Sequence, residues 1–153
     1  MKDPKNVARG KKSRKSGADF ERRVRKDLES GGWVVSKWMN NFSDYPDSNI
    51  NLPPEEREDR KLIPAKHKFR GKGIPMAIGT GFPDFIAFRN QVALDLYEII
   101  GVECKTNGYL DKEERAKCKW LLENNIFSKI LIASKKTDGR KILIKYDEFK
   151  RDN

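Results

Sequence analysis

Two β-rich runs, residues 85–88 and 97–102, constrain what this chain can fold into more than any other feature of its sequence. Two such runs joined by a connection of several residues are typical of a β-hairpin. Asp84 precedes the first run and Glu103 follows the second. If the hairpin closes near Ala93, the two carboxylates lie beside each other at its open end.

The open end of this hairpin also carries an amine. Side chains alternate between the two faces of a strand, so Lys105 shares the face of Glu103 and Cys104 points to the other face. Two hard oxygen ligands beside a lysine suit Mg²⁺ and a phosphate ester, and Mn²⁺ can substitute. Two structural roles remain open at this point: Asp84 as a turn cap, and Glu103 with Lys105 as a surface ion pair.

The charge of the chain favours a polyanionic partner. Its 153 residues include 33 lysines and arginines against 23 acids, which gives a formal net charge of +10. Such an excess is expected of a protein that binds DNA, RNA or an anionic membrane surface. No apolar run reaches the length of a membrane span, and no apolar segment follows the basic amino terminus. We therefore expect an intracellular, cytoplasmic protein without a membrane partner.

Residues 1–16 form a basic segment with almost no apolar side chains. We expect a flexible arm that is disordered on its own. Two interpretations of this arm remain: a solubilising tail, or a segment that grips phosphate groups. Under the second, the candidate contacts are Lys11, Lys12, Arg14 and Lys15.

Helices and strands are predicted on both sides of the hairpin. Phe20, Val24 and Leu28 recur every four residues and predict a helix over residues 17–30. The length of the chain suits a single domain, residues 17–150, around one core. The further predicted elements are a strand at 33–39, a helix capped by Asp111 that ends near Asn124, and strands at 129–134 and 141–146.

A long segment, residues 40–80, separates the predicted strand from the hairpin. It is rich in Asn, Asp, Pro and charged residues. Loops of this length in compact domains are usually functional or disordered, so we consider both a substrate-contacting flap and a mobile insertion without a role. The candidate phosphate contacts in this segment and on the two predicted helices are Lys68, Arg70, Lys72, Arg22 and Lys117.

Three short motifs together resemble the PD-(D/E)XK superfamily of metal-dependent nucleases. The hairpin supplies Pro83-Asp84 and Glu103-Cys104-Lys105, and the first helix supplies Gly17 with Glu21 four residues later. The surrounding sequence is similar to archaeal-type Holliday-junction resolvases and to VRR-type nucleases. The resemblance covers residues 15–39 and 81–134. It implies an α/β fold with a restriction-endonuclease-like core, a mixed central β-sheet flanked by helices.

Two departures from the family pattern stand out. Residues 110–115 resemble the family's Leu-Ser-x-x-Gln helix start, but Glu114 stands where the family has glutamine. The small resolvases connect the strand to the hairpin quickly, whereas residues 40–80 intervene here.

Each motif residue has an expected role in phosphodiester hydrolysis. Asp84 and Glu103 are expected to bind the metal directly, and Lys105 to orient the attacking water or neutralise the transition state. The resemblance adds the main-chain carbonyl of Cys104 as a third ligand. It also places Glu21 at the metal site, through a water or a second metal ion. Without the hairpin motifs, Glu21 beside arginines would be interpreted as part of a solvated helix face.

We therefore expect a Mg²⁺-dependent endodeoxyribonuclease that hydrolyses phosphodiester bonds in branched DNA, as a Holliday-junction resolvase does. Resolvases of this type are symmetric dimers, so the resemblance also implies a homodimer. Two alternatives remain open. One is a nuclease of the same fold that acts on flap, single-stranded or duplex DNA, which the long insertion favours. The other is a non-catalytic nucleic-acid-binding protein of the same fold.

Overall fold

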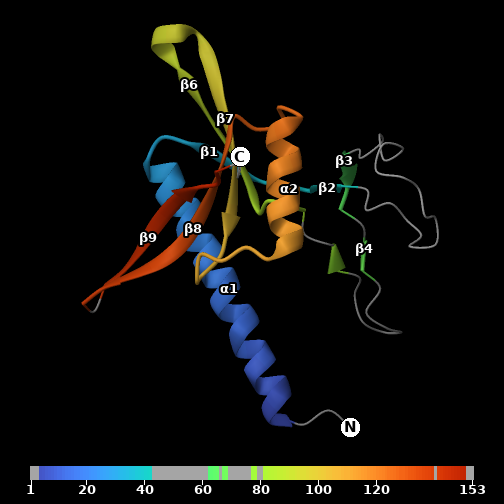
Figure 1. Ribbon diagram of the computed structural model, residues 1–153. Coiled ribbons are helices and arrows are strands. Elements are labelled where there is room, and N and C mark those ends of the chain that lie inside the picture. The colour runs from blue at the N-terminus through green and yellow to red at the C-terminus, as the bar shows by residue number, and fades with distance from the viewer. Residues whose placement is uncertain are drawn as a thin grey trace, which may run out of the picture.

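A five-stranded mixed sheet forms the centre of the computed structural model, which describes residues 4–42, 62–65, 67–68, 77–78, 81–139 and 141–150 (Figure 1). The strands lie in the order β1-β6-β7-β8-β9, and neighbours are antiparallel except for the parallel pair β7 and β8. Their bounds are Val34–Lys37 (β1), Phe85–Gln91 (β6), Leu96–Cys104 (β7), Lys129–Asp138 (β8) and Lys141–Glu148 (β9).

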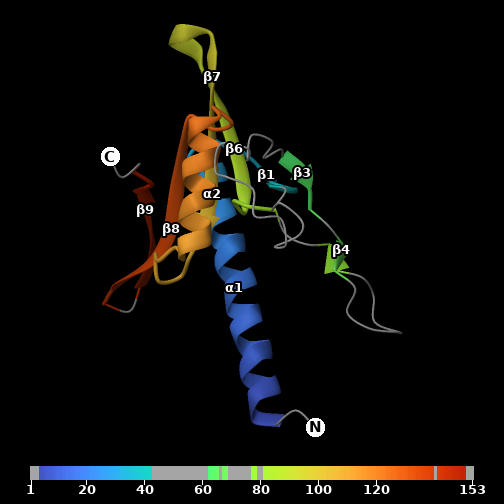
Figure 2. The ribbon, with the colours of Figure 1, turned by 45° about the vertical axis from the view of Figure 1, so that its right-hand side comes forward.

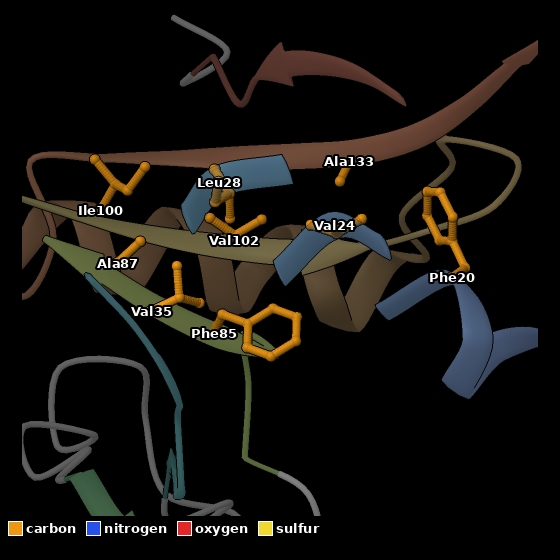
Figure 3. Close-up of a cluster of buried hydrophobic side chains, with 9 residues drawn as sticks. All are labelled: Phe20, Val24, Leu28, Val35, Phe85, Ala87, Ile100, Val102 and Ala133. Carbon is orange, nitrogen blue, oxygen red and sulfur yellow. The ribbon is translucent and has the colours of Figure 1, made fainter. Parts of the chain in front are cut away.

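Helices α1 (Pro4–Ser30) and α2 (Lys112–Glu123) pack on opposite faces of this sheet (Figures 1 and 2). Because side chains alternate along a strand, β8 serves both faces: Ala133 joins the core under α1, and Ile132 joins the core under α2. This arrangement confirms the predicted α/β class with a mixed sheet flanked by helices. Figure 3 shows the core under α1, which contains Phe20, Val24, Leu28, Val35, Phe85, Ala87, Ile100, Val102 and Ala133.

The first helix begins at Pro4, so the boundary expected at Gly17 is wrong. From Pro4 onward, the basic segment expected to be a flexible arm is the first half of α1. Proline is favoured at the start of a helix because its φ angle is already helical. Adding residues to an existing helix needs no new nucleus, and the many lysines and arginines are good helix formers. The packed stripe of Phe20, Val24 and Leu28 therefore supports an extension that buries little itself.

Strands β6 and β7 form the predicted hairpin, which closes through a short 3-10 turn at Val92–Leu94. Asp95 completes the turn in the left-handed conformation, which Asp and Asn adopt more readily than most residues. The register pairs Phe85 with Val102, so Asp84 falls opposite Glu103, as the sequence predicts. The tip of the hairpin reaches beyond the other strands, at the top of Figure 1.

Helix α2 makes the crossover between the parallel strands β7 and β8. It starts where the sequence predicts, at an N-cap formed by Asp111. The Asp111 carboxylate accepts the Glu114 backbone N–H at 2.8 Å, and the Glu114 carboxylate accepts the Asp111 backbone N–H at 3.0 Å. This capping box satisfies two backbone donors at the helix start and fixes the position of Glu114.

Parts of the long insertion form two small strand pairs. Asn40–Phe42 (β2) pairs with Leu62–Pro64 (β3), and His67–Lys68 (β4) pairs with Ala77–Ile78 (β5). Arg70 and Lys72, which were candidate phosphate contacts, lie outside the described residues, and so does the side chain of Lys68. Within the described ranges, no helix is long and apolar enough to cross a membrane.

Two glycines give opposite predictions for stability. Gly17 has open space around the position of a Cβ atom in the middle of α1, so Gly17→Ala should stabilise the protein by about 0.5–1 kcal/mol. At Gly81 a Cβ would overlap the Trp38 carbonyl oxygen and lie 2.6 Å from that of Asn40, so Gly81→Ala should destabilise it by about 1–3 kcal/mol. Urea unfolding of both variants measures the two changes; equal shifts would contradict the close approach at Gly81.

Glu98 on β7 connects to side chains of β6 and β8, and its environment leads us to predict that stability depends on pH. It bonds Lys129 at 2.6 Å, Arg89 at 3.0 Å and Gln91 at 2.8 Å. The bond from Lys129, outweighing burial and helped by Arg89, lowers the pKa of Glu98 below its ordinary value. A lowered folded-state pKa stabilises the fold above the ordinary glutamate pKa, and this contribution disappears as pH falls through the folded value.

Glu98→Gln should therefore cost roughly 1–2 kcal/mol at pH 7 and progressively less as the solution is acidified below about pH 4.5. Urea unfolding between pH 3 and pH 7 measures the difference from wild type. Glu148→Gln, an exposed acid on β9, serves as the control and should show a small difference at every pH. A constant cost of Glu98→Gln across this range would contradict the assigned network.

Candidate active site

Asp84 and Glu103 meet at the open end of the β6–β7 hairpin, each accepting a backbone N–H from the opposite strand. The Asp84 N–H donates to Glu103 Oε2 at 3.1 Å, and the Cys104 N–H donates to Asp84 Oδ2 at 2.9 Å. The Trp38 N–H donates to the Asp84 carbonyl at 3.1 Å and holds this backbone from the other side. The two acids are thus fixed side by side, as the sequence predicts.

A glycine allows the segment before Asp84 to lie against β7. A Cβ atom at Gly101 would stand 2.9 Å from the Pro83 ring and 3.1 Å from the Phe127 ring. Pro83 is fully buried in this contact. Glycine at position 101 therefore lets the proline that precedes Asp84 pack directly on the strand that carries Glu103.

Glu103 is a buried carboxylate in a site of excess negative charge. Its side chain is only 9% exposed. Burial first, and then the negative charge of Asp84, raise its pKa to about 8, although Lys105 pulls in the opposite direction. A buried group of this kind favours either a proton or a cation beside it.

Lys37 brings Glu21 into the same site. Its Nζ lies 2.7 Å from Glu21 Oε2 and 3.3 Å from Asp84 Oδ1, so one ammonium bridges α1 and the start of β6. Burial alone would lower the pKa of Lys37, but its bonds and charge interactions with Glu21 and Asp84 outweigh this and raise it. Glu21 therefore lies beside the hairpin acids, as the sequence predicts, and Lys37 connects it to Asp84.

Lys105 lies on the face of Glu103, as predicted, and contacts acids on two elements. Its Nζ is 3.6 Å from Glu103 Oε1 and is hydrogen bonded to Glu114 Oε1 of α2. Burial alone would lower the pKa of Lys105. Its interactions with Glu114 and then with Glu103 outweigh burial and raise that pKa above the ordinary lysine value. The amine is therefore held as a cation, with its position fixed from α2.

The Cys104 side chain packs on the core under α1, as the alternation of β7 predicts. Burial, followed by the charges of Asp84 and Glu103, raises the pKa of its thiol. Both cysteines are free thiols, and burial likewise raises the pKa of Cys118 to about 12. Thiolate chemistry is therefore disfavoured at both positions, since the thiolate is the reactive form.

The candidate phosphate contacts fall into different environments. Arg22 pairs with Asp19 at 2.7 Å, and Lys117 pairs with Glu113 at 2.5 Å. The Arg14 Nε donates to the Gly10 carbonyl within α1. Lys12 and Lys15 are exposed on α1 and line one pocket, whereas the side chain of Lys11 lies outside the described part. Among the candidates whose side chains the structure describes, only Lys12 and Lys15 line a common pocket.

The acids of the site suit a divalent cation as a pair. Within the described residues, no group of three or more His, Cys, Asp and Glu side chains is arranged to hold a metal ion by itself. Asp84 and Glu103 nevertheless supply two adjacent carboxylates, and Glu103 is buried with an excess of negative charge around it. Mg²⁺ needs few protein ligands and keeps several waters, so the donor set fits such an ion.

Two residues of this cluster, Lys37 and Glu114, are absent from the sequence-based set of site residues. Lys37 shares a strand face with Val35, and its position depends on the pairing of β1 with β6, which residues 33–39 alone do not reveal. The sequence did contain a signal for Glu114. This residue stands at the glutamine position of the family's helix start and three residues after the predicted N-cap.

No family model, curated protein sequence or solved structure matches this chain.

Lys37 should be coupled energetically to Asp84. Lys37→Met removes the bridging cation and should destabilise the protein by roughly 1 kcal/mol at pH 7. In that background Asp84→Asn should be less costly than in wild type, with a coupling of about 0.5 kcal/mol or more, because it relieves repulsion among the remaining acids. Urea unfolding with a chelator present measures this cycle.

The matched control for this cycle is Lys136→Met, an exposed lysine on β8. Its combination with Asp84→Asn should be additive, because the two sites share no contact. Additive effects for Lys37 as well would contradict the bridge between α1 and β6.

Proposed function

We propose that this protein is a metal-dependent endodeoxyribonuclease with a restriction-endonuclease-like core of the PD-(D/E)XK type, acting on branched DNA. One observation carries the proposal: Asp84, Glu103 and Lys105 converge at the end of the hairpin, and Lys37 joins Glu21 to them. A turn cap or a surface ion pair would not require Glu103 to be buried with a pKa near 8. The convergence favours a catalytic cluster over these structural roles.

The metal would be held by Asp84 and Glu103, with the main-chain carbonyl of Cys104 and, through water, Glu21 as further ligands by resemblance. When bound, Mg²⁺ or Mn²⁺ supplies charge neutralisation at the phosphate and a more acidic attacking water. Asp84 and Glu103 are pre-positioned for this by the two backbone N–H groups that they accept. Their orientation is thus set before any substrate arrives.

Lys105 acts on the reacting phosphate or on the attacking water. Its contacts with Glu103 and Glu114 keep it protonated and fix its direction, so it serves as a positioned cation and hydrogen-bond donor. Glu114 acts through Lys105, and is a positioning residue in this scheme. Lys37 is placed to balance the negative charge of Glu21 and Asp84. When another cation binds, these bonds can break and free the two carboxylates.

The substrate is proposed from charge and symmetry. The formal charge of +10 favours DNA as the partner, and the negative charge of Asp84 beside the buried Glu103 suits the metal. A homodimer belongs to the proposal, because two-fold branched junctions require two cuts related by symmetry.

A second candidate substrate class is flap, single-stranded or duplex DNA, cut by the same residues. Segments of the insertion reach the site end of the sheet: the Phe82 N–H donates to the Asn40 carbonyl at 2.9 Å, and the Ala65 N–H to the Met39 carbonyl at 2.7 Å. An insertion anchored this close to Asp84 can change which DNA forms reach the cluster.

A cleavage assay tests the proposal. Labelled four-way junction, flap, single-stranded and linear duplex DNA are incubated with wild type, Asp84→Asn and Lys105→Met, in Mg²⁺, in Mn²⁺ and in chelator. Wild type should make metal-dependent paired nicks in the junction. Each variant should lower the rate at least about a hundredfold, because Asp84→Asn weakens the proposed metal site and Lys105→Met removes a positive charge that acts on the reacting phosphate.

The matched control is Asp95→Asn, which makes the same change at the tip of the hairpin. Asp95 is exposed and in the left-handed conformation, which Asn tolerates, so activity should stay at the wild-type level. Metal-dependent cutting of other DNA forms would favour the second substrate class. DNA binding without cleavage of any form, unchanged in Asp84→Asn, would overturn the nuclease and leave a non-catalytic binding protein.

A further inference from the structure

A basic pocket lies between α1 and the β8–β9 hairpin, separate from the cluster around Asp84. Its volume is about 240 Å³. Most of its charged lining is cationic, with a single acid, and two apolar side chains complete it. The lining residues are Lys12, Lys15, Ser16, Asp19, Phe20, Arg23, Lys135 and Ile142.

The cations of this pocket are available to a ligand. The single acid, Asp19, pairs with Arg22 rather than with a pocket cation. Lys135 lies over the ring of Phe20, with Nζ 5.3 Å from its centre. Among the described residues, no carboxylate lies within ion-pair distance of the four pocket cations, Lys12, Lys15, Arg23 and Lys135. Four cations gathered without such an acid favour an anion.

The pocket adjoins the candidate active site along the same end of the sheet. The Lys105 N–H donates to the Ala133 carbonyl at 2.8 Å, and the Lys135 N–H donates to the Thr106 carbonyl at 3.2 Å, so the backbone of Lys135 lies beside that of residues 105–106. The Lys105 side chain faces Glu114 of α2 and the Lys135 side chain faces Phe20 of α1, so the pocket lies on the α1 side of the site. On α1, Phe20 precedes Glu21, and Lys15 is about 9 Å from Glu21 along the helix axis. A chain of phosphates that crosses the active site can therefore continue into this pocket.

We propose that the pocket is a second phosphate-binding subsite, which holds the nucleic-acid backbone next to, but outside, the bond that is cut. This inference rests on the proposed function and adds to it two residues without an assigned role, Arg23 and Lys135. The four cations and the Ser16 hydroxyl suit a phosphodiester, and Ile142, which is 49% exposed, offers an apolar surface to the sugar. The subsite positions the strand and leaves the chemistry to the cluster around Asp84.

Binding measured without cleavage tests this subsite. Fluorescently labelled four-way junction and duplex DNA are titrated with the full chain in chelator, over a range of salt concentrations. Lys135→Ala and Arg23→Ala should each weaken binding roughly threefold to tenfold, to similar extents on different sequences. Each should also reduce the slope of log affinity against log salt by about 1, because one phosphate contact is lost.

The chain offers a matched control for each variant. Lys136→Ala makes the same change at the next residue of β8, which is exposed and points to the other side of the strand. Arg25→Ala makes the same change on α1 at a residue that pairs with Glu29 on the surface. Both controls should keep the wild-type slope. Equal losses in the pocket variants and the controls would overturn the subsite.

Parallel assays separate this proposal from the nuclease. Wild type that binds DNA through Lys135 and Arg23 but cuts nothing with Mg²⁺ would overturn the nuclease and support the subsite. Wild type that cuts DNA, with pocket variants that keep full affinity and slope, would overturn the subsite alone. Binding to vesicles of phosphatidylserine and phosphatidylcholine that depends on Lys135, without DNA binding, would overturn it in favour of a lipid headgroup.

Discussion

The site depends on two hydrogen bonds across the hairpin, from the Asp84 N–H to Glu103 and from the Cys104 N–H to Asp84. Each carboxylate accepts an N–H from the opposite strand, so the two side chains continue the β6–β7 ladder beyond its last residue pair, Phe85 with Val102. A slip of one residue by either strand would send its acid to the opposite face, away from the other acid. The register is in turn fixed by the buried alternation of Phe85, Ala87, Ile100 and Val102 under α1. Packing of the core therefore determines the geometry of the cluster.

Around that contact, the chain gathers charges of both signs from four elements. The carboxylates of Glu21, Asp84, Glu103 and Glu114 face the ammonium groups of Lys37 and Lys105. The acids outnumber the lysines, and the raised pKa of Glu103 follows from burial together with this imbalance. The chain as a whole carries a formal charge of +10, so this local excess of acids is opposite in sign to the net charge. Under the proposed function, the overall charge attracts the polyanion and the local charge holds the cation.

How far the sequence predicts this site depends on the distance over which each signal acts. Asp84, Glu103 and Lys105 were predictable because one hairpin sets their positions through local alternation and a short turn. Helix α2 was predictable from its cap. The start of α1 at Pro4 was not, because a polar basic segment has no apolar period, and its helicity depends on the packed turns that follow. The position of Lys37 required the pairing of two distant strands, β1 with β6, and the pocket cations required the packing of α1 against the β8–β9 hairpin.

Under the proposed function, the continuity of α1 has a consequence for the recognition of DNA. A flexible arm would let Lys12 and Lys15 follow phosphates at many distances from the active site. In one uninterrupted helix, these lysines and Glu21 have a fixed separation, and Tyr146 holds the same helix to β9 through a 2.8 Å bond to Asp27. Phosphate contacts carry no sequence information, so two such points at a fixed spacing select the path of the backbone. A protein built in this way would discriminate among DNA forms by shape, with the base sequence contributing little.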